Sequence, residues 1–420
     1  MRKYDSYKDS GVKWMGEIPS HWQTVRIKWL LNERIERSED GEGTPLSMSQ
    51  KYGLIPTSEM DVVPNLAANY VGAKRVYTND LVFNKLKAHL GVFAISKNDG
   101  LVSPDYAVYT PTPRTFLPYL EYLFHTQLYI SEFKKKTTGV AIGFTRLYTD
   151  GLFAIYSIYP PLEEQKSIVA YLNKKTAEID EQVSKVEREI ELLKEYKQAE
   201  IARVVIHGLN PNAPTKPSGI SWIGDIPAHW EIRKIKYTFS ERSEKNHPDE
   251  PVLCATQSQG VIPQSMYDNR VVVVNKGFEN LKLVLVGDFV ISLRSFQGGV
   301  EYAYYQGIIS AAYTILTPNS AIDSGYAKLL LKSHNFIQLL KTCVTGIREG
   351  QNINYDLLKN KYIPIPPIDE QQDIATYIEH KTTEIDRLVV ELTYQAEYLK
   401  EYEQRLIADV VTGKINVQPD

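Results

Sequence analysis

"SGVKWMGEIPSHW" occupies residues 10–22, and "SGISWIGDIPAHW" occupies residues 218–230. Extended to residues 30 and 238, the two segments share ten of 21 positions, whereas unrelated segments share roughly one or two. An internal repeat of this kind determines how the whole fold is divided. The phrase contains four of the five tryptophans, and large aromatic side chains are usually buried. We therefore interpret it as the core and cap of a lobe that occurs twice, and its histidines, His21 and His229, as packed structural residues.

A second pair of segments extends the repeat. "PPLEEQKSIVAYLNKKTAEID" (160–180) matches "PPIDEQQDIATYIEHKTTEID" (366–386) at eleven of 21 positions, and "LKEYKQ" from residue 193 matches "LKEYEQ" from residue 399. The order of the segments is the same in both copies. The chain therefore divides into four blocks of the form A–B–A′–B′, at residues 1–160, 161–210, 211–365 and 366–420.

Each A block has the pattern of a mixed α and β domain. Residues 75–86, 275–293 and 307–316 read as short strands around turns. Residues 118–136 and 325–343 have the spacing of one amphipathic helix in each copy.

Each B block predicts one long helix. A Pro-Pro pair precedes it, acidic residues follow in the first turn, and neither copy then contains Pro or Gly until Gly208 and Gly413. Apolar residues three and four apart form a coiled-coil seam, and they are Ile179, Val183, Val186, Ile190 and Leu193 in the first copy and Ile385, Leu388, Leu392, Leu399 and Tyr402 in the second. The predicted fold is α+β, with two pseudo-repeated globular α/β domains separated by two long α-helices that form an antiparallel coiled coil. The alternative is that each helix packs on its own lobe.

Composition excludes several classes of protein. The net charge is −3, with mildly basic A blocks and acidic B blocks, which is compatible with a nucleic-acid partner without requiring one. Cys254 and Cys343 are too few for a disulfide framework or a cysteine metal site, and we expect two buried thiols. The first residues have no apolar core and no apolar run is long enough for a bilayer, so we expect a cytoplasmic protein without a signal peptide.

No complete catalytic constellation is present in the sequence. It contains no phosphate-binding loop, dinucleotide fingerprint, HExxH helix or nucleophile elbow. Pro104-Asp105 followed by Glu132-Phe133-Lys134 has the outline of a magnesium-dependent nuclease site. The second copy has Ala311-Ala312 in place of Pro104-Asp105, and lysines are expected at a helix end. We therefore predict a solvated helix end there, with no metal site and no catalytic residue.

The paired W-x-G-x-I-P-x-H-W phrases, the "PPLEEQ" and "PPIDEQ" hinges, the long helices and the closing "VVTGKI" resemble the specificity subunits of type I restriction–modification systems. The resemblance covers residues 10–417. It implies that each A block is a target-recognition domain for half of a bipartite DNA site, and that the B helices space these domains and dock two methyltransferase subunits. It also implies motor-nuclease subunits as partners, with S-adenosylmethionine, ATP and Mg²⁺ used by the partners and no cofactor in this chain. The first copy reads "VVIHGLN" where the second reads "VVTGKIN", so the first helix end is expected to be irregular.

Discrimination between two different half-sites has to come from residues that differ between the copies. The divergent stretches are polar loops, rich in the side chains that contact base edges and phosphates. The candidate DNA-binding residues are Gln50, Lys51, Tyr52, Lys85, Lys87, His89, Thr145, Arg146, Gln257, Gln259, Arg294, Gln297, Arg348, Gln351 and Asn352. Two other functions stay open, a two-lobed metal-dependent DNA nuclease and an adaptor that binds no DNA.

Overall fold

The computed structural model describes residues 2–62, 69–139, 145–267, 276–345 and 352–418. The chain forms two compact units, one of residues 1–186 with 394–420 and the other of residues 187–393. Each unit therefore contains one A block, called the first lobe (1–160) or the second lobe (211–365), together with part of each long helix.

The two lobes are built on the same four-stranded antiparallel sheet. In the first lobe its order is β4 (Leu31–Arg34), β11 (Tyr106–Pro111), β8 (Leu81–Asn84) and β9 (Phe93–Ile95). In the second it is β16 (Phe239–Arg242), β23 (Thr314–Pro318), β20 (Phe289–Ile291) and β21 (Glu301–Tyr302). Side chains of the first sheet alternate between its two faces. Phe83 and Tyr109 pack in the large core, and Val82 and Val108 pack in a smaller cluster on the other face, so both faces are covered.

Short two-stranded ladders surround each sheet. In the first lobe they are β1–β2 (Tyr7–Asp9, Glu17–Pro19), β3–β12 (Gln23–Arg26, Tyr156–Tyr159), β5–β6 (Leu46–Ser49, Gly53–Pro56) and β7–β10 (Lys74–Val76, Gly100–Val102). In the second they are β13–β14 (Thr215–Pro217, Asp225–Pro227), β15–β26 (Glu231–Lys234, Tyr362–Ile365), β17–β18 (Leu253–Thr256, Gly260–Pro263), β19–β22 (Lys282–Val284, Gly307–Ile309) and β24–β25 (Val344–Thr345, Asn352–Ile353). Short helical segments connect them, namely η1 (Ile27–Trp29), η2 (Thr57–Glu59), η3 (Ala88–Leu90), α3 (Thr149–Phe153), η4 (Ile235–Tyr237), η5 (Gln264–Met266), η6 (Phe278–Asn280), α5 (Ser295–Gly298) and α8 (Tyr355–Leu358).

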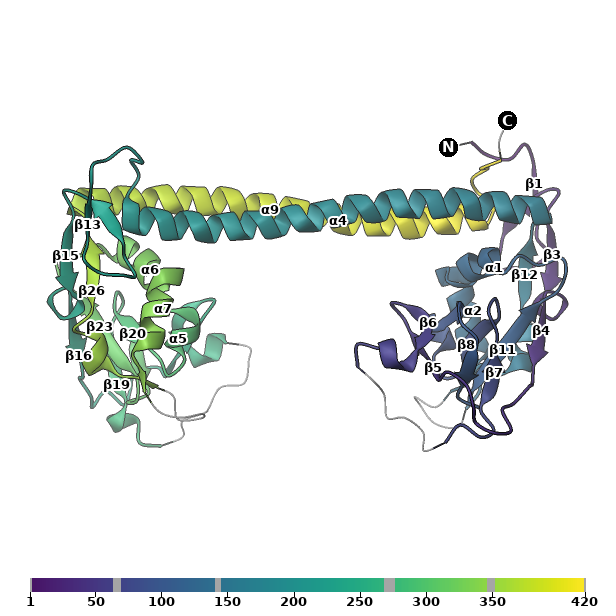
Figure 1. Ribbon diagram of the computed structural model, residues 1–420, viewed down its shortest axis with the longest axis horizontal. Helices are drawn as coiled ribbons and strands as arrows, with labels where there is room; N and C mark the ends of the chain where they lie inside the picture. Colours follow the sequence, from purple (N-terminus) through teal and green to yellow (C-terminus); the bar gives the residue numbers. More distant parts are fainter. Residues whose placement is uncertain (1, 63–68, 140–144, 268–275, 346–351, 419–420) are drawn as a thin grey trace. The chain divides into compact units, whose positions relative to one another are not determined.

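The prediction of one amphipathic helix over residues 118–136 and 325–343 is wrong, because in each lobe this stretch is divided into two helices. The first lobe has α1 (Leu117–Phe124) and α2 (Gln127–Lys136), and the second has α6 (Ser324–Lys332) and α7 (His334–Thr342) (Figure 1). Thr126 and Ser333 adopt extended backbone angles at the two breaks. Their hydroxyls donate to the carbonyls of Leu123 (2.7 Å) and Leu330 (2.8 Å), respectively. A side-chain hydroxyl that bonds the backbone locally competes with a continuous helix, so the apolar period persists while the helix breaks.

The repeated tryptophan phrase forms core and cap, as predicted. Trp22 and Trp230 are fully buried. The Trp230 indole N–H donates to Glu370 Oε2 (3.0 Å), and His229 Nε2 lies 2.7 Å from the same oxygen. The first lobe repeats the histidine contact between His21 and Glu164 (2.9 Å). Both histidines are 52% exposed, so they are surface partners of the hinge glutamates and are not packed inside the lobe as expected.

The hinge glutamines join each long helix to its lobe. Gln165 Oε1 accepts from the Phe116 backbone N–H (3.1 Å), and its Nε2 donates to the Pro160 carbonyl (2.8 Å). Gln371 makes the corresponding bonds to Asp323 N (2.7 Å) and Pro366 O (2.9 Å). A buried amide has to find partners for both its ends, which explains why the Glu-Gln pair occurs in both hinges.

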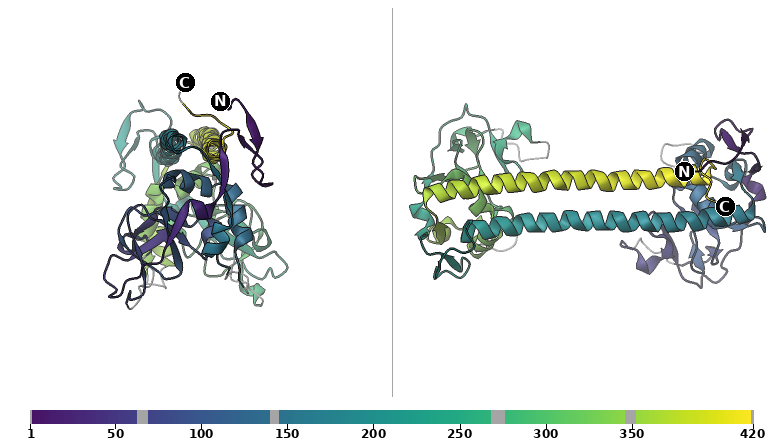
Figure 2. Two further views of the ribbon diagram at one scale, coloured as in Figure 1. Left: turned by 90° about the vertical axis from the view of Figure 1, so that its right-hand side faces the viewer. Right: turned by 90° about the horizontal axis from the view of Figure 1, so that it is seen from above.

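The long helices are α4 (Leu162–His207) and α9 (Ile368–Val411), and both are continuous. Within each unit they lie side by side and antiparallel (Figure 2). In the first unit Ile179 and Val183 share a core with Leu406 and Val410. In the second unit the Tyr377 hydroxyl donates to Glu200 Oε1 (2.9 Å). The predicted antiparallel coiled coil is confirmed, although the first turns of α4 also pack on the first lobe.

The predicted seam is wrong at one position. Ile179, Val183, Val186 and Ile385 are buried, and Ile190, Leu193, Leu392, Leu399 and Tyr402 are partly buried, but Leu388 is exposed. Val389, which is partly buried, and Ala396, which is buried, continue the four-three spacing from Ile385 through Leu392 to Leu399. Spacings of three or four both fit a coiled-coil stripe, so only the partner helix decides between Leu388 and Val389.

Both long helices end on a glycine against a lobe. Gly208 and Gly413 have positive φ values of 74° and 79°, as expected for a helix C-terminus. Gly208 N bonds the carbonyl of Val204, four residues back, whereas Gly413 N bonds that of Val410, three residues back. The prediction of an irregular first helix end is therefore wrong. With one more residue before its glycine, α4 keeps α-helical bonding to its end, and it is α9 that tightens. Cys254 and Cys343 are free and buried as predicted. Within the described ranges, no helix is both long and apolar enough to cross a membrane.

Candidate nucleic-acid interface

Three candidate residues of the second lobe line one cavity of about 600 Å³. Gln257 follows β17, Arg294 follows the strand β20, and Gln297 lies in α5. Tyr267 and Tyr313 complete the wall. All three candidates are exposed, so amide and guanidinium groups that can bond purine edges converge at one place.

The other second-lobe candidates are less clustered. Gln259 lines the neighbouring cavity of about 680 Å³. Asn352 is exposed on β25, where Thr345 Oγ1 donates to its carbonyl (3.5 Å). Arg348 and Gln351 lie outside the described residues.

In the first lobe, a turn and a short helix meet. The turn of Gln50, Lys51 and Tyr52 joins β5 to β6, and all three side chains are exposed. Gln50 Nε2 donates to the Leu90 carbonyl at the end of η3 (3.2 Å). The same short helix carries His89, whose buried Nδ1 has no hydrogen-bond partner among the described residues, and the exposed Lys87 precedes it.

Charged side chains of the first lobe also lie near the end of β8. Arg146 Nη2 is 3.8 Å from Asp105 Oδ1, and the Arg146 and Thr138 backbones exchange two hydrogen bonds of 2.9 Å. Leu147 N donates to the carbonyl of Lys85 (2.9 Å), which brings this loop against β8. Thr145 is partly buried in the same segment. Burial lowers the pKa of Lys85, and the nearby Lys74 lowers it further.

Corresponding positions of the two lobes carry different chemistry. Val108 lies opposite Arg34 and Val82 in the first sheet, as Ile315 lies opposite Arg242 and Val290 in the second. The pair of Asn84 with Tyr106 therefore corresponds to Ser292 and Tyr313, which keeps the tyrosine and changes its neighbour. After Asn84 the first lobe continues with Lys85, and after Ser292 the second continues with Leu293-Arg294. The scaffold therefore stays constant while the polar groups at its loop ends change.

The nuclease outline does not form a metal site. Glu132 is buried and pairs with Lys135, and Asp105 pairs with Arg146. Among the described residues, no group of three or more His, Cys, Asp or Glu side chains is placed to hold a metal ion.

Residues 19–192 and 224–388 each match the model of the type I restriction modification DNA specificity domain. The chain belongs to this family of specificity subunits. Among its relatives are the type I restriction enzyme MjaVIII specificity subunit of Methanocaldococcus jannaschii, 25% identical over 98% of this chain and 97% of that one, and the EcoKI specificity subunit of Escherichia coli, 19% identical over 85% and 83%. The fold is similar to the HsdS subunit from Thermoanaerobacter tengcongensis, with a TM-score of 0.58, 16% identity and coverage of 95% and 98%. It is also similar to a chain from a study of complex assembly in the type I restriction–modification system, with a TM-score of 0.68, 16% identity and coverage of 95% and 99%.

As a specificity subunit, the chain is the DNA-recognition component of a type I restriction–modification system and is not a catalytic subunit. Such a subunit assembles with DNA and with other subunits of the system. The nuclease and adaptor alternatives have no support in these findings.

Sequence reasoning missed two residues of the specificity subunit beside the second-lobe cavity. Glu301 is buried, and its Oε2 lies 2.6 Å from Lys332 Nζ. Glu301 lies opposite Val290 as Ala94 lies opposite Val82, so the corresponding first-lobe residues are Ala94 and His125. A comparison of the two copies at these positions would have detected two charged residues of opposite sign in the second lobe where the first has alanine and histidine.

Proposed function

We propose that each lobe of this specificity subunit reads one half of a bipartite DNA target. The observation that supports this most directly is the constant lobe scaffold, on which Gln257, Arg294 and Gln297 gather in the second lobe and Lys85 and Arg146 in the first. Two readers that share a scaffold and differ in their base-contacting loops are the simplest means of recognising two different half-sites.

The long helices would space the lobes and dock two methyltransferase subunits, and motor-nuclease subunits would join this core. Tyr196, Tyr394 and Tyr398 of these helices are 47–68% exposed, and exposed aromatic side chains are enriched at protein interfaces. S-adenosylmethionine, ATP and Mg²⁺ would be used by the partner subunits, with the whole assembly in the cytoplasm. The chain itself would hold no cofactor.

Lobe replacement tests the independence of the two readers. Residues 1–160 are replaced with the first lobe of another family member, and the chain is co-expressed with its methyltransferase subunit. Methylome sequencing should then show a new sequence in one half of the modified site and the original sequence in the other. A change in both halves would contradict independent reading.

The assignment of chemistry to the partners has its own test. The pure chain, incubated with duplex DNA and Mg²⁺, should produce neither cleavage nor methylation. Cleavage that disappears in Asp105→Ala would restore the nuclease interpretation. Binding to random-sequence duplex DNA is measured by mobility shift, with and without the methyltransferase subunit. A chain that binds no DNA in either case would support the adaptor alternative.

A further inference from the structure

Each lobe has a pair of side chains where its first short helix ends against the edge strand of the sheet. The helices α1 and α6 correspond, because the backbone N–H groups of Phe116 and Asp323 just before them bond the hinge glutamines. The edge strands β9 and β21 also occupy the same place in their sheets. Glu301 lies opposite Val290 as Ala94 lies opposite Val82. This pair is therefore Ala94 with His125 in the first lobe and Glu301 with Lys332 in the second.

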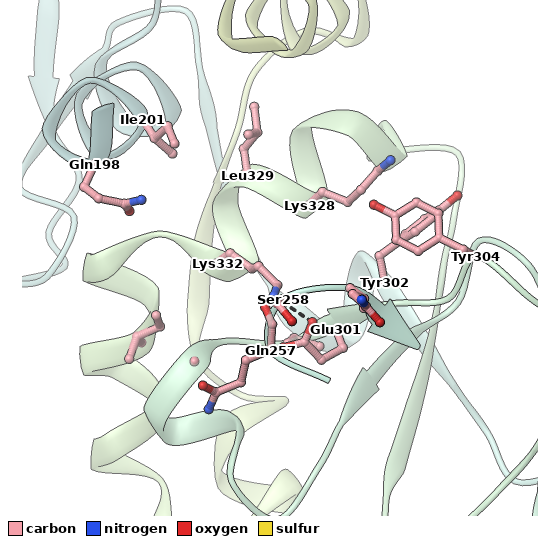
Figure 3. A pocket seen from close by; sticks show the side chains of 15 residues that line it. Gln198, Ile201, Gln257, Ser258, Glu301, Tyr302, Tyr304, Lys328, Leu329 and Lys332 are labelled. Atoms are coloured by element: carbon pink, nitrogen blue, oxygen red, sulfur yellow. Dashed lines mark hydrogen bonds and ion pairs between the residues drawn. The ribbon is translucent and has the colours of Figure 1, made fainter. Parts of the chain in front are cut away.

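The second-lobe pair holds three segments together. Glu301 is the first residue of β21 and is 3% exposed. Lys332 is the last residue of α6, and its Nζ lies 2.6 Å from Glu301 Oε2. The same Nζ donates to the carbonyl of Gln257 (2.9 Å), in the turn after β17. Figure 3 shows the side chains of Lys332 and Glu301 facing each other beside this turn. Breaking a buried ion pair is strongly destabilising, because it leaves an unpaired charge in the interior. Lys332 is therefore held at Glu301, and its hydrogen bond to Gln257 restricts the position of the turn.

Close packing also fixes the position of α5 relative to this turn. A Cβ at Gly298 would lie 2.7 Å from Cδ of the Gln257 side chain. A Cβ at Gly299 would lie 2.8 Å from the carbonyl oxygen of Leu331 and 3.0 Å from the Cα of Lys332. The turn, α5 and the end of α6 therefore touch without spare room. Gln257 lies on the turn, Arg294 precedes α5 and Gln297 lies within it. The same packing therefore positions all three residues.

The first lobe restrains its loops through different bonds. His125 Nε2 lies 3.2 Å from the Gly91 carbonyl, and Gln50 Nε2 donates to the Leu90 carbonyl. The His125 ring packs against Phe93 with a centroid distance of 4.1 Å, in place of the ion pair that Lys332 makes in the second lobe.

We propose that the Glu301–Lys332 ion pair is the positioning element for base discrimination by the second lobe, because it fixes Gln257 relative to Arg294 and Gln297. This inference rests on the proposed function. Side chains that recognise base edges must be held within roughly 0.5 Å of their productive geometry. Lys332 and Glu301 act through the recognition residues and do not contact DNA themselves.

The test uses the complete methyltransferase complex and compares Lys332→Met with Lys332→Arg. Methionine keeps the apolar length of the side chain and removes the contacts to Glu301 and Gln257, whereas arginine retains the donors. The readout is the methylation rate on the cognate site and on sites with one base changed in either half. Lys332→Met should reduce discrimination in the second half-site about tenfold, the value of one good base contact. Discrimination in the first half-site should stay as in the wild type. Lys332→Arg should keep wild-type discrimination in the second half-site as well.

Lys328→Met is the matched control. Lys328 lies four residues before Lys332 in α6, lines the same cavity and packs over the Tyr302 ring (4.2 Å). Its substitution should leave both half-sites unchanged. The thermal midpoint of each variant is measured alongside, because a purely structural role would lower stability and methylation of all sequences together.

A double variant, Glu301→Ala with Lys332→His, addresses the case in which Lys332→Met does not fold. It installs the first-lobe pair, which removes the buried charge and the bond to Gln257. We expect a folded complex with relaxed reading of the second half-site. Full discrimination in this variant, or a uniform loss across sequences in folded Lys332→Met, would overturn the inference. A wild-type complex without any bipartite methylation would instead refute the proposed function, so the two failures are distinguishable.

Discussion

Gly413 shows how one residue ties the end of a long helix to a lobe. Its φ is +79°, and an added Cβ would lie 2.5 Å from Pro19 Cδ and 2.8 Å from Trp22 Cζ3. The carbonyl of Gly413 also accepts from the Tyr7 hydroxyl (3.1 Å). Glycine is needed here for both its left-handed backbone and its lack of a side chain.

Gly413→Ala should destabilise the chain more than Gly16→Ala does. Gly16 has a similar φ of +69°, but an added Cβ would meet nothing within 4 Å. The loss of stability in Gly16→Ala therefore reflects only the cost of alanine in a left-handed backbone, about 1–2 kcal/mol. Gly413→Ala adds the cost of overpacking, about 1–3 kcal/mol. Denaturant unfolding of both variants gives the difference, and equal losses would show that the contact with Trp22 relaxes freely.

Substitutions of two arginines in the second lobe should have different effects, one on DNA recognition and the other on stability. Arg242 Nε bonds the buried Asp288 (2.8 Å), whereas Arg294 is exposed at the candidate interface. Arg294→Ala should cost about 1–3 kcal/mol of binding and relax one position of one half-site. Arg242→Ala should lower the thermal midpoint instead. Binding measured on a set of single-base variants decides, and a uniform loss for Arg294→Ala would identify a phosphate contact.

The two long helices differ at one informative position of their repeat. Lys197 in "LKEYKQ" corresponds to Glu403 in "LKEYEQ". Lys197 Nζ lies 2.7 Å from both carboxylate oxygens of Asp386. The corresponding pair in the first unit is Glu403 with Asp180. Burial raises the pKa of Glu403, and the charge of Asp180 raises it further. One unit thus has an attractive pair where the other has a repulsive one.

Glu403→Lys should stabilise the coiled coil of the first unit by about 0.5–1 kcal/mol, a range set by solvent screening of a partly exposed pair. Because the pKa of Glu403 is raised in the folded state, wild-type stability increases as the pH falls through that pKa. The advantage of Glu403→Lys should therefore be largest at neutral pH and shrink on acidification. Thermal unfolding across pH measures this. Lys197→Glu, which creates the repulsive pair in the second unit, is the matched control and should destabilise at neutral pH.

Across the whole molecule, each lobe is held by the start of one long helix and the end of the other. The first lobe contacts Gln165 of α4 and Gly413 just after α9, and the second contacts Gln371 of α9 and Gly208 just after α4. Adding residues to one helix alone would strain one of these attachments. Any change in spacer length therefore requires matched insertions in both helices.

Duplicating residues 187–190 and 393–396 together should lengthen the unread spacer of the DNA target. Four residues add about 6 Å of helix and rotate the chain only about 40° beyond one turn, while base pairs are about 3.4 Å apart. Both half-sites should be retained, with a spacer longer by about one or two base pairs. Matched two-residue insertions rotate the chain by about 200° and should abolish activity. Methylome sequencing gives the spacer directly, and an unchanged spacer with full activity would show that the helices do not set it.

The sequence by itself determined the repeat, the α+β lobes and the two long helices, because these depend on local signals. Pro-Pro starts, uninterrupted apolar spacing and terminal glycines act within a few residues of one another. Only the tertiary structure decided that Thr126 and Ser333 break a helix, that Leu388 is exposed, and that Lys332 bonds Glu301 and the carbonyl of Gln257. In the candidate interface, the sequence identified polar loops but not which of their side chains converge. Those outcomes depend on groups far apart in the chain, whose contacts exist only once the packed elements bring them together.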